Sequence, residues 1–290
     1  MIENYLWEEL ATFADQKTLA KTAKILNVTQ PTITRGMQKL EDYLGVQLFQ
    51  REPNRITLTK TGEKAAAEAK NILALNEQVI ENIINMDQSQ QVISIACTLP
   101  GPQILLKALK KDLGENVLIE DQIQNEDVST SLKNHKFSLI LSNQEIYDDE
   151  VESLFIGSER LFVNLNQFMY QASQNSVTFA DLKGLSFLAL SDFGPWKEIT
   201  KTKIPAAKFL YQEQEENLAE ISKYSDFPFF STNLTQCSQY LRIEENDNNN
   251  RVTIPVIDEL DHLDIFASYL KSEKKTIKKI LTLLTNNWPK

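Results

Sequence analysis

Five side chains between residues 30 and 38 carry the clearest chemistry in the sequence. They are amides, hydroxyls and a guanidinium, namely Gln30, Thr32, Thr34, Arg35 and Gln38. Groups of these kinds donate and accept hydrogen bonds at base edges and phosphates in the major groove of DNA. In a helix, these five lie on the face opposite Ile33 and Met37. The pattern therefore predicts a helix that reads DNA.

Two short helical patterns, joined by a tight turn, position this face. The first covers residues 18–26, and its apolar positions are Leu19, Ala20, Ala23 and Leu26. Asn27 tolerates the left-handed conformation that ends a helix, and Val28 is expected to be the apolar plug of the turn. Thr29 is suited to cap the second helix, and Pro31 in its first turn loses no needed N–H. The inward positions of the second helix recur at helical spacing and are Ile33, Met37, Leu40 and Leu44.

The charge around these helices is basic. Between residues 17 and 40 there are five basic residues and no Asp or Glu, a local charge of +5 in a chain of net charge −10. The basic residues are Lys17, Lys21, Lys24, Arg35 and Lys39. Because salt screens charges over about 8 Å, a distant acidic domain need not cancel a basic face. An ordinary helical hairpin with a solvated basic side is the alternative, but the turn, caps, core spacing and charge together favour DNA binding.

A two-stranded hairpin is expected directly after these helices. Gly45 is suited to stop the second helix, and residues 53–54, Pro-Asn, indicate a turn between two short apolar runs. Arg51 and Arg55 flank the tip of the hairpin, where they could contact phosphates or the minor groove. The pattern predicts a DNA-contacting wing, and a plain surface hairpin is the alternative.

A long helix is predicted from residue 59 to about residue 86, followed by a polar linker at residues 87–91. Its apolar positions alternate at spacings of four and three, which is the heptad seam of a coiled coil. The seam consists of Ala65, Ala69, Ile72, Asn76, Val79, Ile83 and Met86. Asn76 is its polar member, and one such residue fixes register and partner number. We expect the seam to lack a partner within the chain and to pair with a second copy; packing on its own domain is the alternative.

From residue 92 onward, short apolar strands alternate with helical patterns, which predicts a largely parallel α/β sheet. Polar residues stand at several strand ends, where ligands of such sheets gather. They are Thr98, Ser142, Asn143 and Ser191, with Pro100 at the start of a helix and Ser231 in a later strand. The hydroxyl of Thr98 and the free N–H groups of that helix would suit a carboxylate or another anion. Roles as helix caps and turn residues are the alternative.

Composition and motifs exclude several classes of protein. The 290 residues suffice for two or three compact units, and no run approaches the roughly 18 apolar residues of a membrane span. The amino terminus lacks a signal-peptide pattern, and Cys97 and Cys237 form no CxxC motif. We therefore expect a cytoplasmic protein with reduced thiols; a redox switch at these cysteines is the alternative. His135 and His262 are the only histidines and match no metal motif, so we expect no enzymatic activity, metal or cofactor.

The pieces LAKTAKILNVTQPTITR, LEDYLGVQLFQR and LTKTG make the first 62 residues resemble the DNA-binding domain of LysR-type transcriptional regulators. The order of the predicted elements also fits this family. The resemblance implies a combined α+β and α/β fold, with a winged helix-turn-helix domain at 1–62, a linker (dimerisation) helix at 63–91 and an effector-binding domain at 92–290. This last domain is similar to a periplasmic binding protein. Its two subdomains are expected at 92–162 with 266–290, and at 163–265.

The family also implies roles for individual residues. DNA contacts are implied for Gln30, Pro31, Thr32, Thr34 and Arg35 in the recognition helix, for Thr18 and Thr29 at helix starts, and for Arg51 and Arg55 in the wing. The implied partners are a double-stranded DNA operator with an interrupted inverted repeat, a small-molecule effector, further copies of the chain in a dimer or tetramer, and RNA polymerase. Two strand crossovers, near residues 160–165 and 264–268, would form the hinge between the subdomains.

The sequence departs from the family pattern at two places. Gly36 stands where the family usually has a polar residue, so we expect a DNA contact to be missing there. Residues 225–232, SDFPFFST, lack the glycines that the family usually places before a late strand, so we expect a different cleft wall and ligand. Two other classes are an enzyme that kept the α/β domain and a solute-binding module with a vestigial N-terminal domain. The missing catalytic set argues against the first, and the basic face argues against the second.

Overall fold

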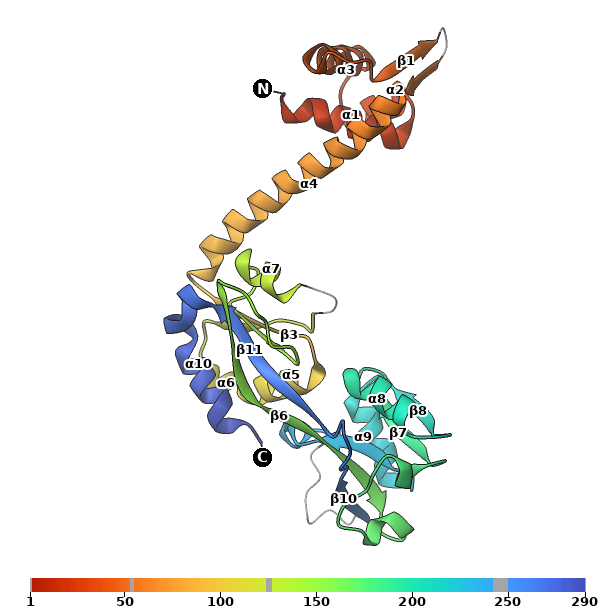
Figure 1. Cartoon of the computed structure of the whole chain (residues 1–290), viewed down its shortest axis with the longest axis vertical. Coiled ribbons are helices and arrows are strands. Elements are labelled where there is room, and N and C mark those ends of the chain that lie inside the picture. The colour runs from red at the N-terminus through yellow and green to blue at the C-terminus, as the bar shows by residue number, and fades with distance from the viewer. Residues whose placement is uncertain (1, 53–54, 124–126, 242–249, 290) are drawn as a thin grey trace. The chain divides into compact units, whose positions relative to one another are not determined.

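The computed structural model describes residues 2–52, 55–123, 127–241 and 250–289, and Figure 1 labels its elements. The chain divides into two compact units, residues 1–84 and residues 85–290. Each unit has a hydrophobic core of its own and is described by itself. Within the described ranges, no helix is long and apolar enough to cross a membrane.

Three helices build the core of the N-terminal unit. They are α1 (Asn4–Gln16), α2 (Leu19–Ile25) and α3 (Gln30–Leu44). The inward positions predicted for α3 are confirmed at Ile33, Met37 and Leu40, each of which is at most 1% exposed. Leu44 and Val28 are 37% and 39% exposed, so an inward Leu44 and a buried plug at Val28 were wrong predictions. Leu44 ends its helix and Val28 lies in a turn, where neighbouring elements cover side chains less.

The turn between α2 and α3 agrees with the sequence pattern. Asn27 adopts the left-handed conformation, with φ of 54°. The hydroxyl oxygen of Thr18 accepts a hydrogen bond from the backbone N–H of Lys21, and that of Thr29 accepts one from Thr32, both at 3.4 Å. These caps satisfy N–H groups that lack partners at a helix start, and they confirm the predicted helix-turn-helix.

An antiparallel pair of strands, β1 (Phe49–Glu52) and β2 (Arg55–Leu58), forms the wing. Its predicted tip at residues 53–54 lies outside the described residues. Gly45 ends α3 in the left-handed conformation, with φ of 67°, as predicted. The hairpin that the sequence predicts after α3 is therefore confirmed.

One carboxylate ties the wing to α3. Oε1 of Glu41, in the last turn of α3, accepts hydrogen bonds from the backbone N–H groups of Leu48 and Phe49 at 2.8 and 3.0 Å. Its Oε2 forms an ion pair with Arg51 at 2.8 Å. Because charge-assisted hydrogen bonds are strong, this side chain fixes the wing relative to the helix.

The helix α4 (Lys60–Ser89) starts in the N-terminal unit. Ala69 is buried in the core of that unit and Ala65 packs against it, so the seam has a partner within the chain at these positions. The prediction of a seam with no such partner was therefore wrong at its first two members, because α4 is needed to close the core around α1. From Ile72 onward the seam is open: Ile72, Val79 and Ile83 are 38%, 48% and 67% exposed.

Within the described residues, nine strands form one mixed sheet in the C-terminal unit, in the order β4-β3-β5-β11-β6-β9-β7-β8, with β10 also paired to β6. The strands are β3 (Ile93–Cys97), β4 (Val117–Ile119), β5 (Leu139–Ser142), β6 (Val151–Asn166), β7 (Ser186–Leu190), β8 (Lys208–Gln212), β9 (Phe229–Thr232), β10 (Arg251–Pro255) and β11 (His262–Leu270). We call lobe 1 the part built on β3, β4, β5, β11 and the first part of β6. Lobe 2 is the part built on β7, β8, β9, β10 and the end of β6.

Helices cover both lobes. Those of lobe 1 are α5 (Pro100–Ala108), α6 (Lys110–Leu113), α7 (Val128–Lys133) and α10 (Lys274–Asn287), with a short 3₁₀ turn η4 (Lys271–Glu273). Those of lobe 2 are α8 (Pro195–Lys203) and α9 (Glu215–Tyr224), with the 3₁₀ turns η1 (Tyr170–Ser173) and η2 (Ala180–Leu182). The turn η3 (Leu234–Cys237) follows β9 and packs against α5. Figure 1 shows α10 lying along the sheet of lobe 1.

The two long strands, β6 and β11, make the sheet mixed rather than largely parallel. β3 is parallel to β4 and β5, and β7 is parallel to β8 and β9, as predicted. β6 and β11, however, run antiparallel to each other and to their other neighbours, so the prediction of a largely parallel sheet was wrong. β6 leads the chain from lobe 1 into lobe 2, whereas β11 begins where the chain has returned and runs back along the first part of β6, so the two strands are antiparallel.

β6 crosses between the lobes at residues 160–161, within the region predicted for the first crossover. Arg160 pairs with β11 in lobe 1, and Leu161 pairs with β9 in lobe 2. The second crossover was predicted wrongly at residues 264–268. These residues lie inside β11, already in lobe 1, so the chain returns between the end of β10 and the start of β11.

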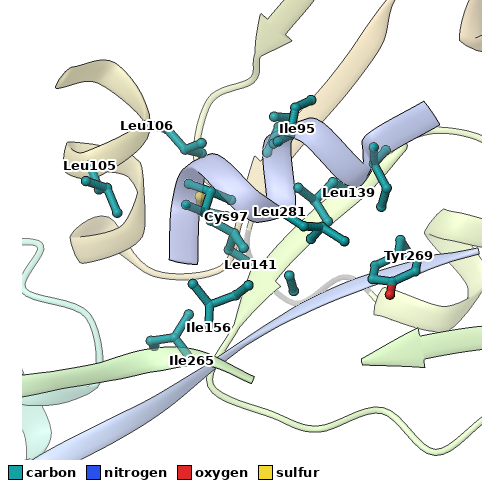
Figure 2. Close-up of a cluster of buried hydrophobic side chains, with 14 of the residues drawn as sticks. Ile95, Cys97, Leu105, Leu106, Leu139, Leu141, Ile156, Ile265, Tyr269 and Leu281 are labelled. Carbon is teal, nitrogen blue, oxygen red and sulfur yellow. The ribbon is translucent and has the colours of Figure 1, made fainter. Parts of the chain in front are cut away.

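A buried apolar cluster fills lobe 1 between the sheet and its helices, as Figure 2 shows. Strand residues such as Ile95, Leu139 and Ile265 meet Leu106 of α5 and Leu281 of α10 there. A second cluster, built around residues of β6, β7, α8 and β10, fills lobe 2. The lobes therefore have separate cores and share the long strand β6.

Candidate nucleic-acid interface and effector site

The polar face predicted on α3 is exposed in the structure. The side chains of this face that are exposed are Thr29, Gln30, Pro31, Thr32, Arg35 and Gln38, and Thr18 is exposed at the start of α2. Thr34 is half-buried, and its hydroxyl donates to the backbone carbonyl of Gln30 at 3.0 Å. The inner face of α3 is fully buried, so the helix presents its donors and acceptors from a fixed support.

Two of the predicted basic groups are already paired within the N-terminal unit. Lys39 donates to Glu3 at 2.9 Å and to the hydroxyl of Tyr5 at 3.2 Å, and these contacts raise the pKa of Lys39. Arg51 is paired with Glu41, as described above. Arg55 is exposed on β2 and lines a cavity of about 470 Å³ together with Lys17 and others. Of the two wing arginines, Arg51 is thus held by a carboxylate, whereas Arg55 is exposed.

Gly36 does not lie on the exposed face of α3. It is buried, and a Cβ atom at this position would lie 1.7 Å from Oε2 of Glu9 on α1. The interpretation of Gly36 as the place of a missing DNA contact was therefore wrong, because the residue faces the core. The carboxyl of Glu9 fills the space instead. Burial, and to a lesser degree the neighbouring Glu8, raises the pKa of Glu9 to about 7.

The effector residues predicted at strand ends divide into two groups. Ser142 donates to the carbonyl of Gln144 at 3.0 Å, and Ser231 accepts from Asn164 at 2.8 Å inside lobe 2, so both hydroxyls serve local structure. Asn143 is half-buried beside Ser142, and Ser191 uses its carbonyl to accept from Lys197 at 2.7 Å.

Thr98 and Pro100 remain at the junction of the lobes. The hydroxyl of Thr98 is buried and has no hydrogen-bond partner within the described part of the chain. Pro100 opens α5, and its ring approaches lobe 2: a Cβ atom at Gly194 would lie 2.8 Å from Cδ of Pro100. Gly194 has φ of 56°, a conformation that glycine adopts without strain. The two lobes therefore touch beside the start of α5.

A groove of about 600 Å³ opens between α5 of lobe 1 and α9 of lobe 2. Pro100, Gln103, Ile104 and Lys107 line one side, and Glu215, Glu216, Cys237, Ser238 and Tyr240 are among the residues of the other. The hydroxyl of Ser238 donates to Glu215 at 2.6 Å. The groove is large enough for a small organic molecule and carries both signs of charge.

Sequence reasoning missed Glu159, which lies at the same junction. This residue of β6 is 3% exposed, and a Cβ atom at Gly101 would lie 2.3 Å from its Oε1. Burial raises the pKa of Glu159 to about 7, although Thr232 and Trp196 of lobe 2 favour the charged form. Ser158 and Arg160 flank Glu159 in the sequence, so nothing there marked this glutamate as buried, and the partners of the strand were needed to show its burial.

The thiols and histidines form no second site. Cys97 lies in the apolar cluster of lobe 1, where burial raises the pKa of its thiol and disfavours the reactive thiolate. His135 contacts Glu273 at 3.0 Å, and His262 contacts Asp261 at 2.6 Å. No group of three or more His, Cys, Asp or Glu suited to a metal ion occurs among the residues that the structure describes.

These features define a winged helix-turn-helix protein that also carries an α/β domain of two lobes. Residues 7–63 match the family described as bacterial regulatory helix-turn-helix protein, lysR family. The N-terminal part of the chain therefore belongs to the helix-turn-helix domains of the LysR-type transcriptional regulators.

Relatives and solved structures agree with this assignment. The HTH-type transcriptional regulator YbhD of Escherichia coli is 35% identical over 29% of this chain and 27% of its own length. YybE of Bacillus subtilis is 27% identical over 63% of this chain and 66% of its own length. The chain thus spans between about a quarter and two thirds of these curated relatives.

Solved structures share the fold at low sequence identity. Vibrio fischeri DarR, determined in complex with DNA, has a TM-score of 0.58 at 18% identity and covers 99% of both chains. Full-length OxyR of Pseudomonas aeruginosa has a TM-score of 0.50 at 15% identity, over 99% of this chain and 95% of its own.

Proposed function

We propose that this protein binds double-stranded operator DNA as a homo-oligomer and regulates transcription in response to a small molecule held between its lobes. The observation that carries the proposal is the outward face of α3, where hydroxyl, amide and guanidinium groups are exposed above a fully buried inner face. Such a helix can enter the major groove without reorganisation. The DNA named with DarR in its crystal structure supports this assignment for the fold.

The open part of α4 supports pairing with a second copy. Ile72, Val79 and Ile83 are exposed at heptad spacing, and exposed apolar seams of this kind commonly mark interfaces. A paired chain would present two recognition helices, as an inverted repeat requires. Sedimentation at micromolar concentration tests this step: Val79→Asp buries a charge at the seam and is expected to yield monomers, whereas a monomeric wild type would refute the step.

The junction of the lobes is the proposed effector site. The unpartnered hydroxyl of Thr98 and the adjoining groove of about 600 Å³ support this location. Ligand contacts present in only one arrangement of the lobes would favour that arrangement and so alter the spacing of paired DNA-binding domains. Thr98→Val keeps the shape and removes the hydroxyl, so it is expected to weaken effector binding while leaving ligand-free DNA binding unchanged.

The DNA-binding role is tested with the full chain and DNA from upstream of its own gene. We expect Arg35→Ala to weaken binding by about 1–3 kcal/mol in fluorescence anisotropy if Arg35 reads a base. Lys183→Ala is the matched control, because it removes an exposed positive charge from the C-terminal unit. An unchanged dissociation constant for Arg35→Ala, or an equal loss for Lys183→Ala, would remove Arg35 from the interface.

A further inference from the structure

A buried carboxylate lies where the two lobes meet, and it touches both. Glu159 is on β6 next to the crossover at residues 160–161. On the side of lobe 1 its carboxyl lies against Gly101 in the first turn of α5, within the space that a Cβ atom would need. On the side of lobe 2 it faces the hydroxyl of Thr232 and the indole of Trp196. A change in the angle between the lobes therefore changes the surroundings of this one group.

The backbone on either side of Glu159 is fixed. Asn233, which is 1% exposed, accepts a hydrogen bond from the backbone N–H of Arg160 at 2.9 Å. Its amide also donates to the backbone carbonyl of Ser158 at 3.0 Å. One side chain thus holds both peptide neighbours of Glu159, so its carboxyl is presented in a defined direction.

The polar groups around the carboxyl are poorly satisfied. Trp196 and Thr232 are each 1% exposed, yet the indole N–H and the hydroxyl form no hydrogen bond of ordinary geometry within the described ranges. The groups that act on the pKa of Glu159 are burial, Thr232 and Trp196, and no basic side chain is among them. A buried charge without a counter-charge is costly, and buried donors without acceptors add to that cost. Such an arrangement lowers the stability of the fold. A ligand that supplies the missing counter-charge and acceptor would recover this loss.

The groove lies beside this position. Pro100, which lines the groove, adjoins Gly101, against which the carboxyl lies. The charged residues that line the groove near α5 and α9 are Lys107, Glu215 and Glu216, so they carry a net negative charge. Both the groove and the carboxyl of Glu159 beside it therefore favour a cation over an anion.

We propose that the site between the lobes binds a small molecule through an ammonium group, with the carboxylate of Glu159 as its partner. This inference rests on the proposed function only in taking the junction of the lobes as the effector site. It replaces the anion that the sequence suggests for the start of α5. Pro100 and Pro102 remove two of the first N–H groups of that helix, and a glutamate stands beside those that remain. The indole N–H of Trp196 and the hydroxyl of Thr232 would meet an oxygen acceptor of the same ligand.

The test uses the full chain at pH 8, above the titration of Glu159. Thermal unfolding is measured with n-propylammonium chloride and, at matched ionic strength, with sodium propionate. We expect a concentration-dependent rise in Tm with propylammonium and none with propionate. Glu159→Gln keeps the shape and removes the charge, so it is expected to weaken the apparent affinity at least tenfold, an effect of about 1.4 kcal/mol. Glu159→Asp keeps the charge and is expected to retain a weaker response.

Glu220→Gln is the matched control, because it removes an exposed carboxylate of α9 that does not line the groove and leaves Glu159 in place. It is expected to respond to propylammonium like the wild type. Absence of any response to propylammonium, an equal response in Glu159→Gln, or a response to propionate as large as that to propylammonium would each overturn the proposal. The indole N–H resonance of Trp196 gives a second readout, since this group faces the carboxyl of Glu159.

The outcome is separable from that of the proposed function. Thermal unfolding requires no DNA, so a failure of operator binding would refute the regulatory role and leave the ammonium site standing. A missing propylammonium response in a protein that binds its operator would refute the ammonium site alone.

Discussion

Two glutamates in different units stand in the same relation to a glycine. Glu9 on α1 fills the space beside Gly36 of α3, and Glu159 on β6 fills the space beside Gly101 of α5. Each is at most 4% exposed, and burial raises the pKa of each to about 7. In both places the absence of a Cβ atom lets a carboxyl approach a helix closely.

The two pairs differ in what surrounds the carboxyl. Oε2 of Glu9 is buried and has no hydrogen-bond partner among the described residues, within a core of packed helices. Glu159 faces two donors, and these come from the other lobe. Equal pKa shifts therefore arise in a packing contact and in a junction between parts. The shift alone does not mark a functional site; the partners of the group and their freedom to move do.

The largest expected effect concerns the pH dependence of stability at Glu159. Its pKa is about 7 in the folded chain against an ordinary value of 4.5, so the folded state binds the proton more tightly. The free energy of unfolding therefore falls as pH rises from about 4.5 to 7, and the loss is complete above that range. A shift of this size corresponds to about 3 kcal/mol, which Glu159→Gln is expected to abolish. Urea unfolding of both proteins at pH 5 and pH 8 measures it, and parallel pH profiles would contradict it.

A smaller effect is expected when a side chain is added at Gly36. Gly36→Ala places a Cβ atom 1.7 Å from Oε2 of Glu9, which overpacks the core by about 1–3 kcal/mol. Glu9→Ala in the same chain removes the clash, so the double variant is expected to recover most of the loss. Thermal unfolding of the two single variants and the double variant measures the coupling. Additive effects would show that Glu9 and Gly36 do not constrain each other.

The smallest effect is expected on operator affinity in Glu9→Gln. The pKa of Glu9 is raised to the same value as that of Glu159, so the free energy of unfolding of the wild type again falls as pH rises from 4.5 towards 7, by an amount of the same order. Glu9→Gln is expected to remove this dependence on pH. Operator affinity at pH 5.5 and pH 8 should change little in this variant, because Glu9 lies against the buried Gly36 and not on the exposed face of α3. A loss of operator affinity of more than tenfold at either pH would contradict this expectation.

The sequence predicts local features well and contacts between distant segments poorly. The cap at Thr29 and the left-handed Asn27 depend on neighbours within a few residues, and both are confirmed. Gly36 was assigned to the wrong face because its partner, Glu9, lies 27 positions earlier on another helix. The second crossover was misplaced because apolar runs do not reveal which strands pair antiparallel.

The candidate effector site shows the same limit. Hydroxyls at strand ends were easy to find, but Ser142 and Ser231 proved to hold turns and strands together. Glu159 became visible only once β6, α5, α8 and β9 were seen to meet at one point. Polar neighbours, Ser158 and Arg160, made Glu159 resemble an exposed position in the sequence, and the partners that bury it come from segments that the sequence alone does not bring together.

The carboxylate of Glu41 has a mechanical consequence for the N-terminal unit. It accepts hydrogen bonds from two backbone N–H groups at the start of β1 and pairs with one arginine of that strand. Its own backbone belongs to α3. The side chain of Glu41 therefore fixes the spacing between α3 and the wing. We expect that a duplex whose groove and neighbouring backbone do not match this spacing must itself deform in order to bind. The shape of the DNA would then contribute to recognition together with its bases.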